Sequence, residues 1–206
     1  MSRPANTEPK RKQIVEGLMT VMATSGYDGA TIPLIAKAAG LTSGLVHYYF
    51  DSKQSILVEL VRHLVRLVDA RFQSAVTSDP KSELAAYIDA HLALGTGANP
   101  KAVACWICIG AAAVNQPEIR LIYQEATENQ VTILEKICEK VLRAEGRKTR
   151  QKREIALGIT AAIEGSYRLL VSAPNMIPKG FASPTVKAMA FGLISSQPLA
   201  SDKRRT

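Results

Sequence analysis

The feature that most constrains the fold is a pair of short helical segments separated by a glycine turn, between residues 32 and 49. Thr31 is a suitable N-cap, and Pro33 follows in the first turn, where its missing N–H costs nothing. Gly40 ends the first segment, and Thr42 caps the second. Two short helices joined by about three residues have the shape of a helix-turn-helix.

Small and apolar residues explain how these two segments can cross. Ala36 is small enough for a close crossing, and Gly40 can adopt the positive φ that the turn needs. The side chains expected in the shared apolar wedge are Ile35, Ala39, Leu41 and Val46. An ordinary helical hairpin inside a core is the alternative for a bare pair of this kind.

The flanking sequence is helical as well. An amphipathic segment carries Ile14, Leu18, Val21 and Met22 on one face and stops at Ser25-Gly26. After the pair, Asp51 or Ser52 caps a long helix that ends before Asp79. Further helices are expected over residues 82–94, 101–114, 117–145, 150–173 and 184–195. With 5% aromatic residues, this pattern predicts an all-α protein of about nine helices.

The segment TIPLIAKAAGLTSGLVHYYFDSK resembles the TetR family of bacterial transcription regulators. The residues that carry the resemblance are Thr31, Ile35-Ala36, Ala39-Gly40, Thr42, Gly44, Tyr48-Tyr49-Phe50 and Lys53. The resemblance spans about residues 11 to 60 and implies a dimeric regulator, commonly a repressor, that binds operator DNA. We expect a helix-turn-helix domain over residues 10–55, a helical effector-binding and dimerisation domain over 56–196, and flexible tails at 1–9 and 197–206.

The resemblance implies two kinds of DNA contact. Phosphate contacts are expected from Thr31, Thr42, Tyr48 and Lys53. Base-edge contacts are expected from among Ser43, Gly44, Leu45 and His47. Arg11 and Lys12 either reach phosphate or the minor groove, or begin a solvated helix. Asp51 is acidic close to the expected DNA backbone, so we interpret it as a cap.

Small residues in the helix predicted over 150–173 indicate a dimer interface. The candidates are Gly158, Ala161, Ala162, Gly165 and Leu169. With the apolar helix over residues 186–194, they are similar to the four-helix dimer interface of the family. Packing within one chain is the alternative.

Aromatic and polar residues between these regions are candidates for an effector site. They are Tyr87, His91, Trp106, Tyr123, Glu164 and Tyr167. The stretches ACWICIGAAAVNQPEIRLIYQE and GITAAIEGSYRLLVSA resemble the BetI-type, choline-responsive subgroup of the family. Aromatic faces around a carboxylate can hold a quaternary ammonium group. The alternative is that each of these residues belongs to the core.

Net charge says little about DNA. The chain carries +8, but residues 1–80 hold nine basic and seven acidic side chains, a net of +2. The excess lies mainly in residues 143–153 and in the last residues of the chain. The assignment to DNA therefore depends on individual residues.

Other chemistries have weaker support. Cys105 and Cys108 form one CxxC inside a predicted helix, so core cysteines are expected, with a redox-sensing regulator as an alternative. The three histidines have no metal-ligand spacing, and no cofactor or catalytic motif is present, which leaves a helical enzyme as a distant alternative. Without a signal-like or spanning segment, we expect a cytoplasmic protein with no membrane partner.

Overall fold

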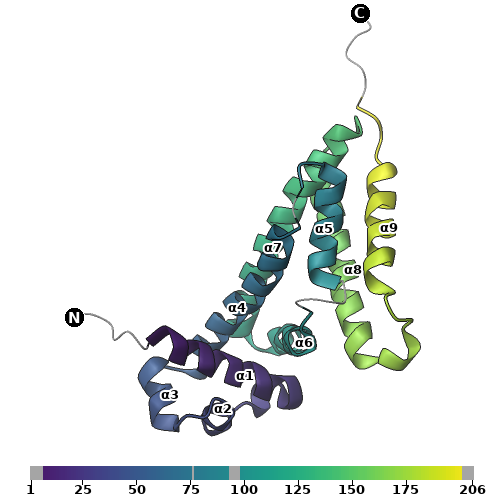
Figure 1. Ribbon diagram of the computed structural model, residues 1–206. Coiled ribbons are helices and arrows are strands. Elements are labelled where there is room, and N and C mark those ends of the chain that lie inside the picture. Colours follow the sequence, from purple (N-terminus) through teal and green to yellow (C-terminus); the bar gives the residue numbers. More distant parts are fainter. Residues whose placement is uncertain (1–6, 76, 93–97, 201–206) are drawn as a thin grey trace, which may run out of the picture. The chain divides into compact units, whose positions relative to one another are not determined.

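The computed structural model describes residues 7–75, 77–92 and 98–200. Within these residues it has nine α-helices and no β-strand, so the expected all-α class is confirmed (Figure 1). In chain order the helices are α1 (Thr7–Gly29), α2 (Ile32–Ala38), α3 (Ser43–Tyr49), α4 (Lys53–Gln73), α5 (Pro80–Leu92), α6 (Pro100–Asn115), α7 (Pro117–Ala144), α8 (Lys152–Ser172) and α9 (Ala182–Ser195).

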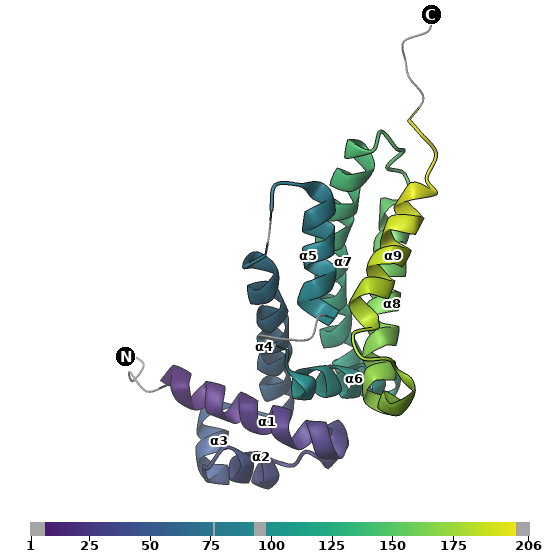
Figure 2. The ribbon, with the colours of Figure 1, turned by 45° about the vertical axis from the view of Figure 1, so that its right-hand side comes forward.

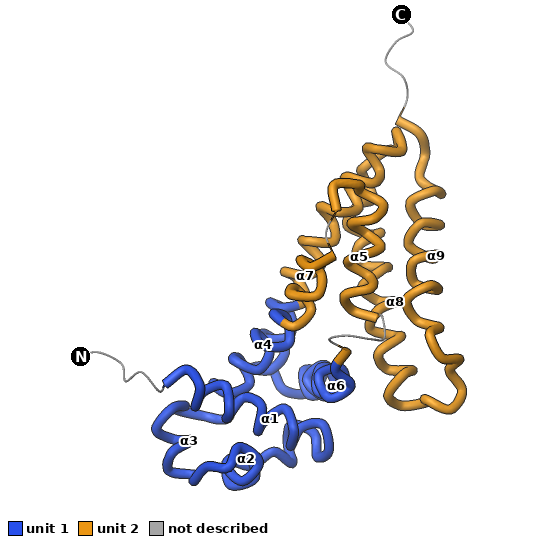
Figure 3. The backbone as a smooth tube through the Cα atoms, in the orientation of Figure 1, with its two compact units in different colours: residues 1–66, 99–126 blue, residues 67–98, 127–206 orange. Residues whose placement is uncertain are grey.

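The chain forms two compact units that interleave along the sequence (Figure 3). Unit 1 comprises residues 1–66 and 99–126, and unit 2 comprises residues 67–98 and 127–206. Helices α4 and α7 each pass from one unit into the other. The predicted division into functional domains between residues 55 and 56 stays a prediction. The division into compact units differs from it, because α6 belongs to the same unit as the N-terminal helices.

Helix α1 is longer at its start than the sequence suggested. It begins at Thr7, with Glu8 in its first turn, so residues 7–9 are helical and do not form a flexible arm. Residues 1–6 of the predicted tail lie outside the described residues. At the other end, Gly26 has φ 66° and ψ −178° and interrupts the helix where the sequence predicted a stop.

In unit 1, α6 packs along α1 (Figure 2). Ile14, Leu18 and Met22 are fully buried on α1, and Ile109 is fully buried on α6. The C-cap of α6 is tied to the last turn of α1, because the Gln116 amide donates to the Asp28 carboxylate at 2.9 Å. Three helices were expected in the N-terminal domain; unit 1 also holds α6, which packs on α1.

In unit 2, α5, α8 and α9 pack against one another, and α7 is joined to α5 by polar contacts (Figure 2). The Tyr87 hydroxyl donates to the Gln130 carbonyl at 3.3 Å, and the Lys140 ammonium binds the Glu83 carboxylate at 2.8 Å. Fully buried apolar side chains of this unit include Leu84, Ile88, Leu134 and Ile194. Unit 2 is therefore a helical bundle with its own core.

The positive charge of residues 143–153 is largely neutralised within unit 2. Lys152 binds Glu139 at 2.6 Å, and Arg153 binds Glu128 at 2.8 Å. Hydrogen bonds from Lys152 and then from Arg143 lower the pKa of Glu139. Four of the six basic side chains in this segment have acidic partners within unit 2: Arg143, Arg147, Lys152 and Arg153.

The expected flexible tail after residue 196 is wrong for residues 197–200. The Lys148 N–H donates to the Pro198 carbonyl at 2.9 Å, and the Ala200 N–H donates to the Gly146 carbonyl at 2.8 Å. The Arg147 guanidinium adds a bond to the Gln197 carbonyl at 2.7 Å. These contacts fasten the chain to the turn between α7 and α8, while residues 201–206 lie outside the described residues.

Helix α8 is the one helix in the described ranges that is long and apolar enough to cross a membrane by length and composition. Core helices of soluble proteins share that composition. In unit 2, α8 packs against α5 and α9 and carries Arg153, Glu164 and Arg168 along its length.

Candidate nucleic-acid interface

The turn between α2 and α3 has the geometry that its glycine predicts. Gly40 has φ 66°. Its N–H donates to the Lys37 carbonyl at 3.1 Å, and the Leu41 N–H donates to the Ala36 carbonyl at 2.9 Å. This pair of bonds is a Schellman motif, which satisfies carbonyls at the end of α2 and turns the chain sharply toward α3.

Helix α3 is capped at its start by a side chain. The Thr42 hydroxyl accepts a hydrogen bond from the Leu45 N–H at 3.3 Å, as predicted. Thr31 holds the same position before α2, with extended backbone, but its side chain makes no cap bond. Only one of the two predicted caps therefore stabilises its helix through a hydroxyl.

The apolar wedge between α2 and α3 forms largely as expected. Ile35 and Val46 are fully buried, Ala36 and Ala39 are nearly so, and Leu41 is half-buried. The sequence reasoning missed Gly17 of α1, which lies against the backbone of α2. A Cβ atom built on Gly17 would lie 2.8 Å from the Ile35 carbonyl oxygen, so only glycine fits this crossing without a shift.

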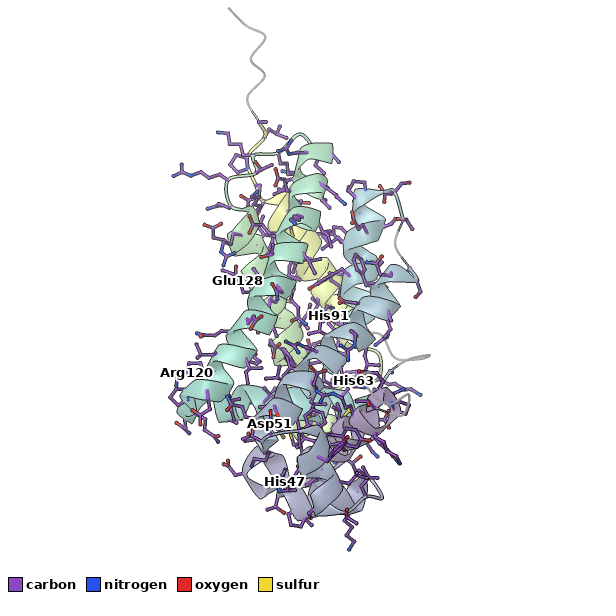
Figure 4. All side chains as sticks on the ribbon, turned by 90° about the vertical axis from the view of Figure 1, so that its left-hand side faces the viewer. His47, Asp51, His63, His91, Arg120 and Glu128 are labelled. Atoms are coloured by element: carbon purple, nitrogen blue, oxygen red, sulfur yellow. The ribbon has the colours of Figure 1, made fainter. Side chains whose placement is uncertain are left out.

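The side of α3 that faces away from this wedge is open to solvent. Gly44, His47 and Tyr48 are exposed, with Tyr48 at 70%, and Ser43 and Leu45 are half-buried. Figure 4 labels His47 on α3 and Asp51 just after it. Nothing within 4 Å would meet a Cβ atom on Gly44, so this part of the surface is open to a large partner.

Asp51 is not the cap of α4. The Ser52 hydroxyl accepts from the Ser55 N–H at 3.1 Å, and the Ser55 hydroxyl accepts from the Ser52 N–H at 3.2 Å. This reciprocal pair satisfies N–H groups at the start of α4 in the manner of a capping box. Asp51 is exposed.

Lys53 has a partner in its own chain. Its ammonium donates to the Tyr27 carbonyl at 2.9 Å and lies 4.0 Å from the centre of the Tyr27 ring. An ammonium has three N–H donors, so this contact leaves capacity for a phosphate oxygen. The sequence reasoning missed this contact, because its two residues lie 26 positions apart and no local pattern joins them.

Arg11 has partners within its own chain. Its guanidinium donates to the Tyr49 carbonyl at 2.6 Å and stacks 4.1 Å from the centre of the Phe50 ring. It is half-buried, so it does not begin a fully solvated helix, whereas contact with phosphate or the minor groove stays a prediction. Lys12 is exposed and lies 3.9 Å from the Glu16 carboxylate.

Four of the proposed effector residues lie in unit 2: Tyr87, His91, Glu164 and Tyr167. The His91 Nδ1 is 2.9 Å from the Tyr87 carbonyl, and the two rings lie 4.6 Å apart. The Tyr167 hydroxyl donates to the His91 carbonyl at 3.4 Å. Burial lowers the pKa of His91 to about 4, so the imidazole is neutral near neutral pH (labelled in Figure 4). Glu164, half-buried, is close enough to raise the pKa of Tyr167 after the larger effect of burial.

Trp106 and Tyr123 belong to unit 1. Their ring centres lie 5.1 Å apart, Trp106 is buried, and Tyr123 is half-buried. The six residues predicted as one effector set therefore divide into a unit 2 group and a unit 1 pair.

The predicted dimer residues lie on α8 in differing surroundings. Ala161 and Gly165 are exposed, and Leu169 is 40% exposed. Ala162 is half-buried, and Gly158 faces α9, where a Cβ atom would lie 3.5 Å from Leu193. Exposed apolar side chains that the sequence reasoning did not single out extend this face onto both helices: Leu157, Met189 and Leu193.

The three cysteines are free and have little thiolate character. Burial raises the pKa of Cys105 and of Cys138 to about 12 and also raises that of Cys108. The Cys108 thiol donates to the Met22 carbonyl at 3.6 Å, at the packing of α6 on α1. Across the described ranges, no group of three His, Cys, Asp or Glu side chains is placed to hold a metal ion.

Comparison with known proteins follows the two parts of the chain. The family described as bacterial regulatory proteins, tetR family, matches residues 14–60. The family described as BetI-type transcriptional repressor, C-terminal, matches residues 80–191, more than half of the chain.

Curated relatives include proteins named HTH-type transcriptional regulator BetI. The one from Stenotrophomonas maltophilia is 27% identical over 191 residues, covering 91% of this chain and 92% of the relative. The one from Vibrio vulnificus is 25% identical over 162 residues, covering 77% and 79%.

Solved structures share the fold at low identity. A transcriptional regulator from Rhodococcus sp. Rha1 has a TM-score of 0.77 at 20% identity, covering 93% of this chain and 99% of its own. A transcriptional regulator from Saccharomonospora viridis, solved in complex with choline, has a TM-score of 0.73 at 20% identity, covering 94% and 100%. At this identity the likeness establishes the fold.

Proposed function

Because the chain belongs to the TetR family of bacterial regulatory proteins, with a BetI-type repressor domain in its C-terminal half, we propose that it represses transcription from an operator and is released by a small quaternary ammonium compound. It is a DNA-binding transcriptional regulator of the TetR type. The observation that carries the proposal is the helix pair α2 and α3. Its Schellman turn and Thr42 cap fix α3 with one side exposed to solvent, the side that carries Gly44, His47 and Tyr48.

On that face we assign two roles. Residues near helix N-termini or with a free hydroxyl or ammonium donor bind phosphate: Thr31, Thr42, Tyr48 and Lys53. Residues along the exposed side of α3 meet base edges: Ser43, Gly44, Leu45 and His47. A helix as short as α3 makes few base contacts, so we assign a twofold dimer on a near-palindromic operator.

The dimer forms through the exposed apolar face of α8 and α9. Ala161, Gly165, Leu169, Met189 and Leu193 lie on this face. Small residues allow helices to approach closely, and the leucine and methionine side chains supply apolar area. Covering this face with a second copy also explains the apolar character of α8 without a membrane.

The effector site lies among Tyr87, His91, Glu164 and Tyr167 of unit 2. A quaternary ammonium group is attracted to aromatic faces and to a carboxylate. A neutral His91 does not repel that charge. The choline held by the Saccharomonospora viridis regulator and the BetI-type family match support this ligand class.

Release requires that the effector bind one spacing of the two recognition helices better than another. A coupling free energy of about 1–3 kcal/mol would change operator affinity by roughly 5–150-fold. We assign the coupling between effector site and DNA-binding helices to α4. This helix begins at Lys53, four residues after α3, and continues from unit 1 into unit 2.

Selection of operators from a pool of random duplexes tests the DNA assignment. Wild-type protein should enrich a near-palindrome. Tyr48→Phe and Lys53→Ala should each weaken binding to all duplexes. Lys53→Ala, which removes a positive charge, should also reduce the slope of log K against log salt by about 0.9. His47→Ala should instead change the preferred base at particular positions. Lys136→Ala on α7 serves as the charge control. Unaltered binding in all three variants would show that α3 does not read DNA.

Calorimetry with choline tests the effector. Wild-type protein should bind choline and lose operator affinity, whereas Glu164→Gln should bind it more weakly. Dimethylbutanol, the uncharged isostere, is the matched ligand control and should bind poorly. No heat at millimolar choline would refute this ligand class and leave the DNA assignment intact.

We place the protein in the cytoplasm with its operator and assign it no catalytic role, in line with relatives named as regulators. The thiol-sensing alternative is weakened by burial, which keeps the three cysteines protonated near neutral pH. Regulation without an effector is the remaining alternative, which the choline experiment tests.

A further inference from the structure

Helix α3 is too short to hold its own orientation. It has seven residues, fewer than an isolated helix needs to form in water. Its direction is therefore set by what it touches outside itself. The side chains that anchor it differ between its two ends.

The N-terminal end is held locally. Thr42 accepts from the Leu45 N–H, and Thr42 adjoins the Schellman turn at Gly40. This anchor involves only neighbours in the chain, and it lies beside Ser43 and Gly44.

The C-terminal end is held from a distance. Val46 is fully buried, and Phe50, the residue after α3, is 3% exposed. Arg11, 38 residues before Tyr49, donates to the Tyr49 carbonyl and covers the Phe50 ring. The positive charge also lies at the end of α3 where the helix dipole is negative, which strengthens the contact.

We infer that Arg11 is a positioning residue for DNA recognition, which fixes the C-terminal end of α3 and so the placement of His47 and Tyr48, without contacting DNA itself. This inference rests on the proposed function. The Arg11 guanidinium is half-buried. One of its faces covers the Phe50 ring, and one of its N–H groups donates to the Tyr49 carbonyl. His47 and Tyr48 immediately precede the residue that it holds.

The two possible roles of Arg11 predict different results. A direct phosphate contact would contribute equally on every duplex and would add to the salt dependence of binding. A positioning residue would act through α3, and its loss would harm selected operators more than random DNA. Loss of a positioning residue would also weaken base preference at the base pairs that His47 contacts. It would leave base preference intact at the base pairs that Ser43 and Gly44 contact.

The test compares Arg11→Met with Lys136→Met, which removes the same charge from an exposed residue of α7 in unit 2. Each protein is assayed by fluorescence anisotropy on the operator selected by wild-type protein and on a random duplex, over a series of salt concentrations. Each is also used to select operators afresh. Circular dichroism checks that the variants are folded. If Arg11→Met is not folded, Arg11→Lys, assayed in the same way, provides the measurement.

We expect Arg11→Met to lower the ratio of specific to random binding about tenfold, the effect of one charged hydrogen bond. Its salt slope should match that of Lys136→Met, and its selected operators should lose preference at the positions that His47→Ala also alters. Arg11→Lys, which keeps the charge but lacks the planar stack, should recover part of the ratio.

A salt slope lower than that of Lys136→Met by about 0.9, with base preference retained, would identify Arg11 as a phosphate contact and overturn the inference. Wild-type specificity in Arg11→Met would overturn it as well. If wild-type protein selects no operator, the proposed function itself fails, so the two failures are distinguishable.

Discussion

Replacing Gly17 with alanine should destabilise unit 1, although alanine is the better helix former. In an unobstructed helix interior the change would stabilise by about 1 kcal/mol. At this site the new Cβ would lie 2.8 Å from the Ile35 carbonyl oxygen and 3.1 Å from the Ala39 Cβ. Overpacking of a buried contact costs roughly 1–3 kcal/mol, so we expect a net loss of about 1 kcal/mol in the free energy of unfolding.

Gly44→Ala is the matched control, because it is also a helical glycine of unit 1 but has nothing within 4 Å of its Cβ position. It should stabilise by about 0.5–1 kcal/mol. The two variants should therefore differ in the free energy of unfolding by about 2 kcal/mol, with opposite signs.

Urea unfolding followed by circular dichroism, at one protein concentration, measures the difference, and operator affinity provides a second readout. Both variants should bind operator more weakly, Gly17→Ala because α2 is displaced and Gly44→Ala because the methyl group keeps α3 from the bases. If Gly17→Ala is as stable as Gly44→Ala, the close approach of α1 to α2 does not constrain the fold and our reasoning about this crossing is wrong.

Three further results are expected. Thr42→Ala should cost about 1 kcal/mol of stability, and Thr31→Ala clearly less, because only Thr42 makes a side-chain cap bond; equal losses in urea unfolding would contradict this. The folded-state pKa of His91, about 4, lies below its unfolded value of 6.5, so the stability it contributes above pH 6.5 is lost as the pH falls toward 4. Between about pH 7.5 and pH 5, wild-type protein should lose about 2 kcal/mol more than His91→Asn, with His47→Asn as an exposed control, and parallel pH curves would argue against a buried neutral imidazole. Alkylation of Cys105 and Cys138 at about pH 8 should be roughly a hundredfold or more slower in the native than in the unfolded protein, and rapid native labelling of either would revive a thiol switch.

Much of the helix order was predictable because helix ends depend on close neighbours in the chain. The positive φ of Gly40, the Thr42 cap and the interruption at Gly26 each follow from residue types within a few positions. The exposed side of α3 also follows from periodicity, since Val46 faces the wedge and His47 and Tyr48 do not.

Predictions failed where two local options were equivalent or where a distant partner decided. Asp51 and Ser52 were equally suitable caps from sequence, and Ser55 selects Ser52 by completing a reciprocal pair. Residues 197–200 have the composition of a free tail, yet backbone bonds to residues 146 and 148 hold them in place.

The sequence by itself determined that this protein is an all-α regulator and where its reading helix begins, because caps, turns and helical periodicity are encoded within a few residues. Only the tertiary structure decided how that helix is held. Arg11 reaches Tyr49 across 38 residues, Lys53 reaches Tyr27 across 26, and Gly17 admits α2 against α1. Such contacts depend on which surfaces meet when the helices pack, and one-dimensional spacing does not specify that.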